Sequence, residues 1–395
     1  MTPAARTQAA IELVDAIVAA AREGGAAADT LIARYFANRR YAGSKDRRAV
    51  RELVYAAIRA AGEIPASGRA AVLTLADGDA ALAATFDGGA HGPAPIAPGE
   101  PRASRGVAPA WLEQALVASG LAATELPTLV DRAPLDCRVN HLKATRDEVL
   151  AAIPDAASIA ATPDGVRLPS GTAVEALPAF RDGWVEVQDA GSQIVGRALP
   201  ADPGARIVDL CAGAGGKTLA LAARMEGKGA LLACDTDRGR LSRLGPRAER
   251  AGVANIETRL LDPKRELDAL TDWIGEADGV LVDAPCSGTG TWRRNPEARW
   301  RLTPARLERF AATQAHVLDL GATLVRPGGD LVYIVCSLLD AEGAAQVDAF
   351  LLRHPGWRAV PLDLPAGRPR GKGVRLDPAH DATDGFFVAR LVAPC

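Results

Sequence analysis

The chain has 395 residues, a formal net charge of −2 and 48% hydrophobic residues. This length exceeds what one hydrophobic core usually holds, so we expect two or three domains. No apolar run reaches 18 residues, and the first ten residues lack a basic segment followed by an apolar one. We therefore expect no membrane span and no secretory signal, and a cytoplasmic location. The six cysteines form no CxxC pair, which predicts free thiols without a metal site or a disulfide framework.

Residues 1–86 are predicted to form a helical domain. Apolar residues recur at helical spacing between 11 and 18 and again between 50 and 58. Ser44 is predicted to cap the second of these helices. Basic residues alternate with aromatic ones from Arg34 to Arg48. That pattern suits RNA binding, and it suits equally a solvated helix pair whose aromatic side chains pack inward.

Residues 87–106 are rich in Gly and Pro and are predicted to be a linker. Residues 107–193 mix a helix near 111–119 with short strand candidates at 137–140, 166–168 and 184–187, which predicts a small α+β domain. In residues 194–395, apolar runs at 207–210, 230–234, 279–283 and 331–335 are separated by helical segments, and 386–391 is a further strand candidate. Continuous apolar runs of this kind predict a parallel sheet buried on both faces, that is, a doubly wound α/β domain.

The segment from Asp209 to Thr218 connects the first of these strands to its helix and is rich in glycine. A Walker A loop would need Gly where Cys211 stands, and a dinucleotide fingerprint would need Gly in place of Thr218. Asp235 ends the next strand, where a carboxylate is placed to accept the hydroxyls of a ribose. A ribose-binding acid without a phosphate motif predicts an adenosine ligand without phosphates, and S-adenosylmethionine (SAM) fits that description.

Two cysteines follow two other strands of the predicted sheet. Cys286 stands in Asp-Ala-Pro-Cys after Asp283, and Cys336 directly follows the next strand. Ligands of such sheets bind beyond the carboxyl ends of the strands, so we expect both thiols at the pocket, although a single cysteine is more often a packed core thiol. Methylation of cytosine C5 needs a thiolate that adds to C6 and then a base that removes the C5 proton. Asp283 is placed to bond the N3/N4 edge of the base. The letters alone leave open which cysteine is the nucleophile.

At these residues the chain resembles the bacterial Sun/Fmu family of RNA 5-methylcytosine methyltransferases. The likeness covers most of the chain, and its most specific motifs are Asp209–Thr218, Asp235–Asp237 with Arg240–Arg243, Asp283–Ser287, Arg293–Pro296, Cys336-Ser337 and Asp384–Phe387. Trp184–Ala190 fits as well, and the segment from Tyr41 to Arg48 resembles the family's helical domain, which is similar to the antitermination factor NusB.

The resemblance implies a Rossmann-like SAM-dependent methyltransferase domain preceded by a helical NusB-like RNA-binding domain and a small α+β domain. It implies Cys336 as the nucleophile and Cys286 in release of the product, with small-subunit (16S) ribosomal RNA as substrate and no metal. The SAM contacts that it implies are Cys211, Ala212, Gly213, Ala214, Gly215, Gly216, Lys217, Asp235, Arg240, Asp262 and Asp283.

Two other functions are compatible with the same residues. A transfer-RNA cytosine methyltransferase would share the chemistry and differ in its RNA-binding half. A ribosome-assembly factor that retains the fold without catalysis is a second alternative, although a binding module needs no thiols at these strand ends. Trp292 to Pro296 follows the catalytic loop and is predicted to contact phosphates and stack on bases, unless Trp292 packs beneath a surface loop. The chain departs from the family at Ala214, Val335 and Leu261, where Pro, Thr and Gly are usual.

Overall fold

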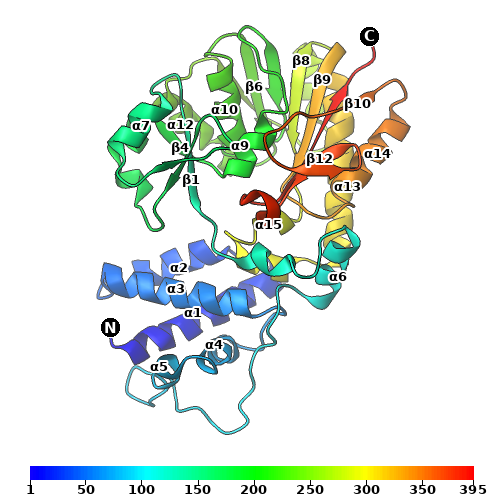
Figure 1. Ribbon diagram of the computed structural model, residues 1–395. Helices are drawn as coiled ribbons and strands as arrows, with labels where there is room; N and C mark the ends of the chain where they lie inside the picture. Colours follow the sequence, from blue (N-terminus) through cyan, green and yellow to red (C-terminus); the bar gives the residue numbers. More distant parts are fainter. The chain divides into compact units, whose positions relative to one another are not determined.

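The computed structural model describes residues 1–395, which divide into two compact units. The first unit comprises Met1–Arg132 together with Thr291–Thr303, and the second comprises Ala133–Gly290 together with Pro304–Cys395. Figure 1 shows the helices of the first unit and the sheets of the second. No helix has both the length and the apolar content needed to cross a membrane.

The first unit is helical, as the sequence predicts. Its α-helices are α1 (Pro3–Glu23), α2 (Ala28–Ala37), α3 (Ser44–Ala60), α4 (Gly68–Ala76), α5 (Ala80–Ala83) and α6 (Ala110–Ala118). Apolar residues at helical spacing on α1, α3 and α4, such as Val14, Val54 and Val72, are fully buried in one core. The prediction that Ser44 caps α3 is wrong. The extended residue is Gly43, because the carboxylate of Asp46 reaches back to accept its amide at 3.3 Å, and Ser44 is the first helical residue.

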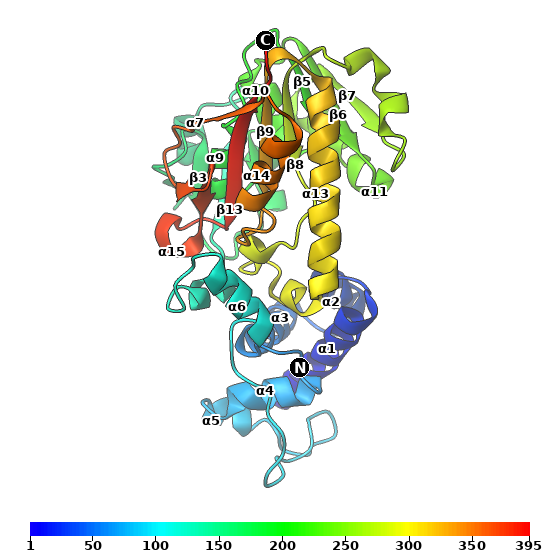
Figure 2. The ribbon, with the colours of Figure 1, turned by 90° about the vertical axis from the view of Figure 1, so that its right-hand side faces the viewer.

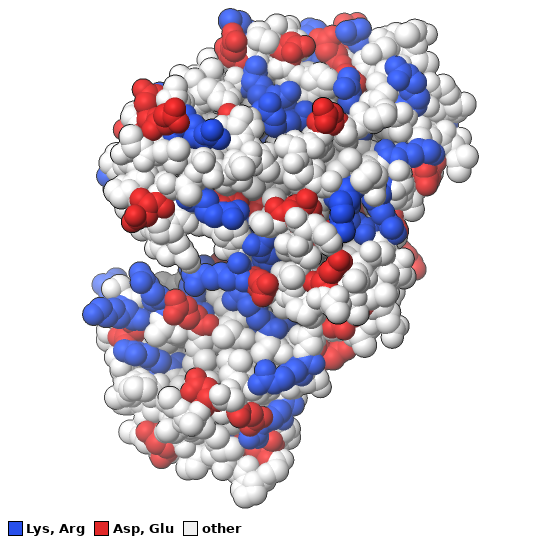
Figure 3. Space-filling model, in the orientation of Figure 1, with Lys and Arg blue, Asp and Glu red and all other residues white.

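The basic and aromatic residues around the α2–α3 turn divide between core and surface. Phe36 is buried, whereas Tyr41 is 72% exposed. The guanidinium of Arg39 stacks on the ring of Tyr35 at 3.6 Å from its centroid. Exposed basic side chains follow at Arg40, Lys45, Arg47 and Arg48. Figure 3 shows Lys and Arg side chains along this unit, interspersed with acidic ones.

The segment 291–303 completes the core of the first unit. It includes a 3-10 helix, η6 (Pro296–Arg301). Arg299 is fully buried and donates at 2.7 and 2.8 Å to the carbonyl of Ile58, in the last turn of α3, and to that of Ala61, directly after the helix. Trp300 joins the apolar core. Trp292 is fully buried too, so the prediction that it stacks on RNA bases is wrong; its indole packs inside the protein.

The second unit begins with a small antiparallel sheet in the order β2-β3-β1-β4. Its elements are β1 (Leu135–Val139), α7 (Arg146–Ala152), β2 (Ala157–Ser158), β3 (Gly165–Leu168), α8 (Pro178–Arg181), β4 (Val185–Val187) and α9 (Ala190–Gly196). The predicted strands at 137–140, 166–168 and 184–187 correspond to β1, β3 and β4. Buried side chains on one face of the sheet, Cys137, Val139 and Val166, pack against Val149 of α7.

The large sheet of the second unit has the order β11-β12-β13-β9-β8-β5-β6-β7, with β10 paired to β13. Its strands are β5 (Arg206–Asp209), β6 (Ala230–Asp235), β7 (Ile256–Leu260), β8 (Ala277–Asp283), β9 (Val325–Val335), β10 (Arg358–Val360), β11 (Arg368–Arg370), β12 (Gly373–Leu376) and β13 (Phe386–Val392). Strands β5 to β9 pair in parallel, and β13, β12 and β11 continue the sheet antiparallel. The strand order reverses between β5 and β8, which is where such sheets bind ligands.

Helices cover both faces of this sheet. They are α10 (Gly216–Arg224), α11 (Arg238–Leu241), α12 (Leu244–Ala251), α13 (Pro304–Leu324), α14 (Ala344–Arg353) and α15 (Pro378–Asp381). Val208 and Val280 face the core under α13 and α14, whereas Ile207 and Leu281 face the core under α9, α10 and α12. Figure 2 shows α13 running along the sheet. The predicted burial of both faces is confirmed, and the class is Rossmann-like α/β.

Candidate active site

The glycine-rich loop runs from the end of β5 to the first turn of α10. Gly213 and Gly215 have φ of +57° and +86°, a conformation that disfavours any side chain. A Cβ at Gly215 would overlap Leu244, and one at Gly213 would overlap the guanidinium of Arg240. No atom lies within 4 Å of the position that a Cβ would take at Gly216. The loop is therefore held tightly on its protein side and has open space in front of Gly216.

Asp235, at the end of β6, holds this loop through its carboxylate. Its Oδ2 accepts the amide of Gly213 at 2.7 Å, and its Oδ1 accepts the amide of Asp237 at 2.7 Å. Each oxygen retains a second lone pair for a further donor. Asp262 lies two residues beyond β7, with an exposed carboxylate that makes no hydrogen bond to the other predicted site residues.

Lys217 and Asp283 form an ion pair between α10 and the end of β8. The Nζ of Lys217 lies 2.6 Å from Oδ2 of Asp283. Burial lowers the pKa of Lys217, but the attraction of Asp283 outweighs it, so its pKa is raised overall. Beneath them, Asp209 accepts a hydrogen bond from Thr218 at 2.7 Å, and desolvation raises the pKa of Asp209 to about 7.

The two predicted cysteines meet at the ends of the neighbouring strands β8 and β9. Their sulfur atoms are 3.4 Å apart, within hydrogen-bond distance for thiols, and both side chains are half-buried. The hydrogen bond to Cys336 and burial raise the pKa of the Cys286 thiol well above its usual value. Cys211 is also near the pocket, but burial raises the pKa of its thiol, as do Asp209, Asp283 and Asp235. The two thiols therefore lie together at this strand edge.

A polar network that the sequence pattern did not predict lies behind the two thiols. Glu342 is 1% exposed and accepts hydrogen bonds from Ser287, Ser337 and Gln314. Thr289 joins the network through Ser337, at 3.1 Å between the hydroxyl oxygens. The only available signal was position: Ser287 and Ser337 each directly follow a cysteine, and nothing marks Glu342 as buried.

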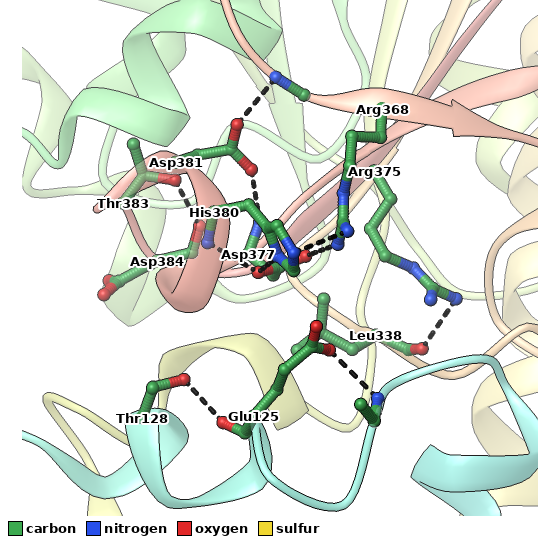
Figure 4. Close-up of polar contacts among 12 residues, drawn as sticks. Glu125, Thr128, Leu338, Arg368, Arg375, Asp377, His380, Asp381, Thr383 and Asp384 are labelled. Carbon is green, nitrogen blue, oxygen red and sulfur yellow. Dashed lines mark hydrogen bonds and ion pairs between the residues drawn. The ribbon is translucent and has the colours of Figure 1, made fainter.

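A second cluster supports the loop after Cys336 (Figure 4). Arg375 of β12 donates to the carbonyl of Leu338 at 3.1 Å and to Asp340 at 2.8 Å. Nearby, Asp377 forms an ion pair with Arg368, and its Oδ1 lies 2.8 Å from Nδ1 of His380. Arg375 thereby connects β12 to the loop that follows Cys336.

Apart from Asp262, which lies beyond β7, the predicted site residues gather at the carboxyl edge of β5, β6, β8 and β9. The glycine loop, Asp235 and Arg240 form one side, and Lys217, Asp283 and the two thiols form the other. Chemically, this is a loop suited to close contact with a small ligand beside a thiol pair suited to covalent attack.

Comparison with known proteins identifies this arrangement. Residues 197–392, which contain all of these side chains, match the family model described as 16S rRNA methyltransferase RsmB/F. The chain belongs to this family. It is 36% identical to the probable ribosomal RNA small subunit methyltransferase B of Synechocystis over 65% of its own length and 59% of that protein. It is 38% identical to the ribosomal RNA small subunit methyltransferase B of Klebsiella pneumoniae over 66% of its own length and 60% of that protein.

The RsmB/F chain described here spans about 60% of the length of these curated relatives. Solved structures share its fold. The crystal structure of PH0851 superposes with a TM-score of 0.78 at 23% identity, covering 99% of each chain. The structure of NSun6 from Pyrococcus horikoshii with SFG superposes with a TM-score of 0.64 at 21% identity, covering 72% of this chain and 98% of that one.

Proposed function

We propose that this RsmB/F-family chain is a SAM-dependent RNA methyltransferase that methylates carbon 5 of cytosine, with small-subunit ribosomal RNA as its substrate. The observation that carries the proposal is the pair of thiols of Cys286 and Cys336, 3.4 Å apart at two strand ends beside the ion pair of Lys217 and Asp283. The names of the family and of the curated relatives support ribosomal RNA as the substrate class.

The glycine loop fits SAM as the methyl donor. Open space in front of Gly216 admits a ligand against the backbone, and the helix start there presents amide groups to it. Asp235 has a free lone pair on each oxygen for the two ribose hydroxyls, and the exposed carboxylate of Asp262 is placed at the next strand end for the adenine amino group. When bound, SAM supplies an electrophilic methyl group.

The protein's own groups would prepare the cytosine for that methyl group. The thiolate of Cys336 adds to C6, which places electron density on C5. After methylation the C5 proton is lost to water, the C5–C6 double bond forms again, and the C6–S bond breaks with its electron pair returning to Cys336. The thiol of Cys286, already at hydrogen-bond distance, stabilises the departing sulfur.

Asp283 would orient the base. Its Oδ2 is held by Lys217, which leaves Oδ1 to accept a hydrogen from the N4 amino group of cytosine. A carboxylate fixed by a buried ammonium does not need to reorganise when the base arrives. This pairing would select cytosine over uracil, because uracil presents an oxygen at that position.

Transfer of labelled methyl from SAM tests the proposal. The full chain would be incubated with unmodified small-subunit ribosomal RNA, and the RNA digested to nucleosides and separated. Label in 5-methylcytidine is the expected result. Label only with transfer RNA would keep the chemistry and replace the substrate, whereas SAM binding without label in either RNA would overturn the reaction.

A further inference from the structure

The carboxylate of Glu342 is a buried acceptor with every position filled. Its Oε1 accepts the amide of Ser287 at 2.8 Å and Nε2 of Gln314 at 3.0 Å. Its Oε2 accepts the hydroxyl of Ser337 at 2.6 Å and also the hydroxyl of Ser287. Four donors match the four lone pairs of a carboxylate, so Glu342 has no position left for substrate.

These contacts join the two segments that carry the thiols. Ser287 directly follows Cys286, Ser337 directly follows Cys336, and Glu342 binds both. Gln314 of α13 extends the connection by donating to the carbonyl of Pro285 at 2.9 Å. Tyr333 of β9 donates to the backbone carbonyl of Glu342 at 2.6 Å, which fixes the carboxylate's own segment. Removing the carboxylate would leave four donors without their common acceptor.

The charges around the two thiols differ. The pKa of the Cys286 thiol is raised by its hydrogen bond to Cys336, by burial and by the charge of Cys336, and then by the charge of Glu342. Lys217 of α10 lies near Cys336, and the negative charge of a Cys336 thiolate helps raise the pKa of Lys217. Tyr333 of β9 also lies near Cys286, and Asp283 is paired with Lys217.

We propose that Glu342 is a positioning residue that joins the two cysteine-bearing segments and holds its buried carboxylate beside Cys286, which makes Cys286 the less reactive thiol of the pair. Its purpose in catalysis rests on the proposed function. The difference in reactivity between the two thiols belongs to the free protein and is measured without RNA. Glu342 thereby distinguishes two chemically identical groups.

The test is alkylation of the full-length protein by iodoacetamide between pH 6 and 10, with each cysteine quantified by peptide mass spectrometry. Glu342→Gln removes the charge at nearly constant shape, and Glu342→Asp keeps the charge. Asp340→Asn is the matched control, because Asp340 lies in the same segment but pairs with Arg370 and Arg375 instead of the serines. Circular dichroism and SAM binding establish that each variant is folded.

In the wild-type protein, Cys286 should react more slowly with iodoacetamide than Cys336 at pH 8. In Glu342→Gln, alkylation of Cys286 at pH 8 should become about ten-fold faster, since thiolate population changes about ten-fold for each pKa unit. Both Glu342→Asp and Asp340→Asn should stay within about three-fold of wild type at Cys286. In methyl transfer, Glu342→Gln should lower kcat while leaving KM for SAM unchanged.

Two results would overturn the proposal. One is a folded Glu342→Gln protein whose Cys286 reacts at the wild-type rate. The other is a wild-type protein in which Cys286 reacts faster than Cys336 at pH 8, a result that decides the matter even if the variant does not fold. Failure of the wild-type chain to methylate RNA would instead reject the proposed function and leave the order of the thiols as measured.

Discussion

The ammonium group of Lys217 and the carboxylate of Asp283 lie 2.6 Å apart, which ties the first turn of α10 to the end of β8. Lys217 is 8% exposed, so its charge is compensated chiefly by this one partner. The same ammonium is near Cys336. Lys217 therefore interacts both with Asp283, the proposed base-binding residue, and with Cys336, the proposed nucleophile.

Lys217→Met should lower the rate of methyl transfer by roughly 100-fold, a typical effect of removing one charged group that stabilises a reacting centre. The reason is that Asp283 loses its partner and the Cys336 thiolate loses a nearby cation. Initial rates with labelled SAM would measure the loss. Lys228→Met is the matched control, since Lys228 pairs with Glu226 on the surface. A rate within three-fold of wild type would contradict this role of Lys217.

The two cysteines should fail in different ways. Cys336→Ala should abolish turnover and any protein–RNA adduct, because the atom that bonds to C6 is gone. Cys286→Ala should accumulate a covalent protein–RNA band on a denaturing gel, because the departing sulfur loses its hydrogen-bond donor 3.4 Å away. The opposite pattern would exchange the two roles. Cys395→Ala, at the exposed C-terminal thiol, should behave as wild type.

Gly216→Ala should separate folding from ligand binding. No atom lies within 4 Å of the added Cβ and the residue begins α10, so stability should be unchanged or raised by up to about 1 kcal/mol. If SAM occupies that space, its affinity should fall at least about ten-fold, equivalent to about 1.4 kcal/mol. Calorimetric titration with SAM and thermal unfolding without it would measure the two effects.

Gly215→Ala is the contrasting variant. Its φ is +86° and its Cβ would overlap Leu244, so it should lose roughly 1–3 kcal/mol of stability. A Gly216→Ala protein that binds SAM as tightly as wild type would place the ligand elsewhere.

Asp209 should make stability depend on pH. Its pKa is raised to about 7 by burial, whereas in the unfolded chain an aspartate titrates near 3.9. Between these values the folded state holds a proton that the unfolded state has released, so stability falls as pH rises through this window. Asp209→Asn cannot ionise. Its free energy of unfolding relative to wild type should therefore increase by roughly 2 kcal/mol between pH 5 and pH 8.

Urea unfolding at the two pH values would measure this change. Glu175→Gln, which alters an exposed carboxylate, should keep a constant difference from wild type. Parallel pH profiles for wild type and Asp209→Asn would show that Asp209 is not the group responsible.

The sequence predicted the parallel part of the large sheet because each of its buried strands is a short continuous apolar run. Strands β10, β11 and β12 carry no such run; Arg368–Arg370 and Gly373–Leu376 become strands only by pairing at the edge of the sheet. The motif residues around Cys286 and Cys336 could be predicted because each motif consists of residues that are adjacent in the sequence. Glu342 could not, because its burial depends on Ser287, Gln314 and Ser337, which come from three other segments.

Trp292 is a second residue whose burial could not be predicted from the sequence. Its position after the catalytic loop, among arginines, favoured a role on the surface, but it is fully buried. Whether an aromatic side chain faces solvent is decided by the packing around it and not by its neighbours in sequence. The location of 291–303 in the helical unit was likewise invisible, since it follows from contacts with helices more than 200 residues earlier in the chain.

That location has a consequence for how the chain is made. The helices of the first unit are synthesised before the second unit. Arg299, which binds carbonyls at the end of α3, and Trp300, which joins the helical core, are synthesised only after β8 and the loop that carries Cys286. Until then the core of the nascent helices lacks Trp300 and the hydrogen bonds of Arg299. The helical unit can therefore be completed only after the glycine loop and the segment with Cys286 have been synthesised.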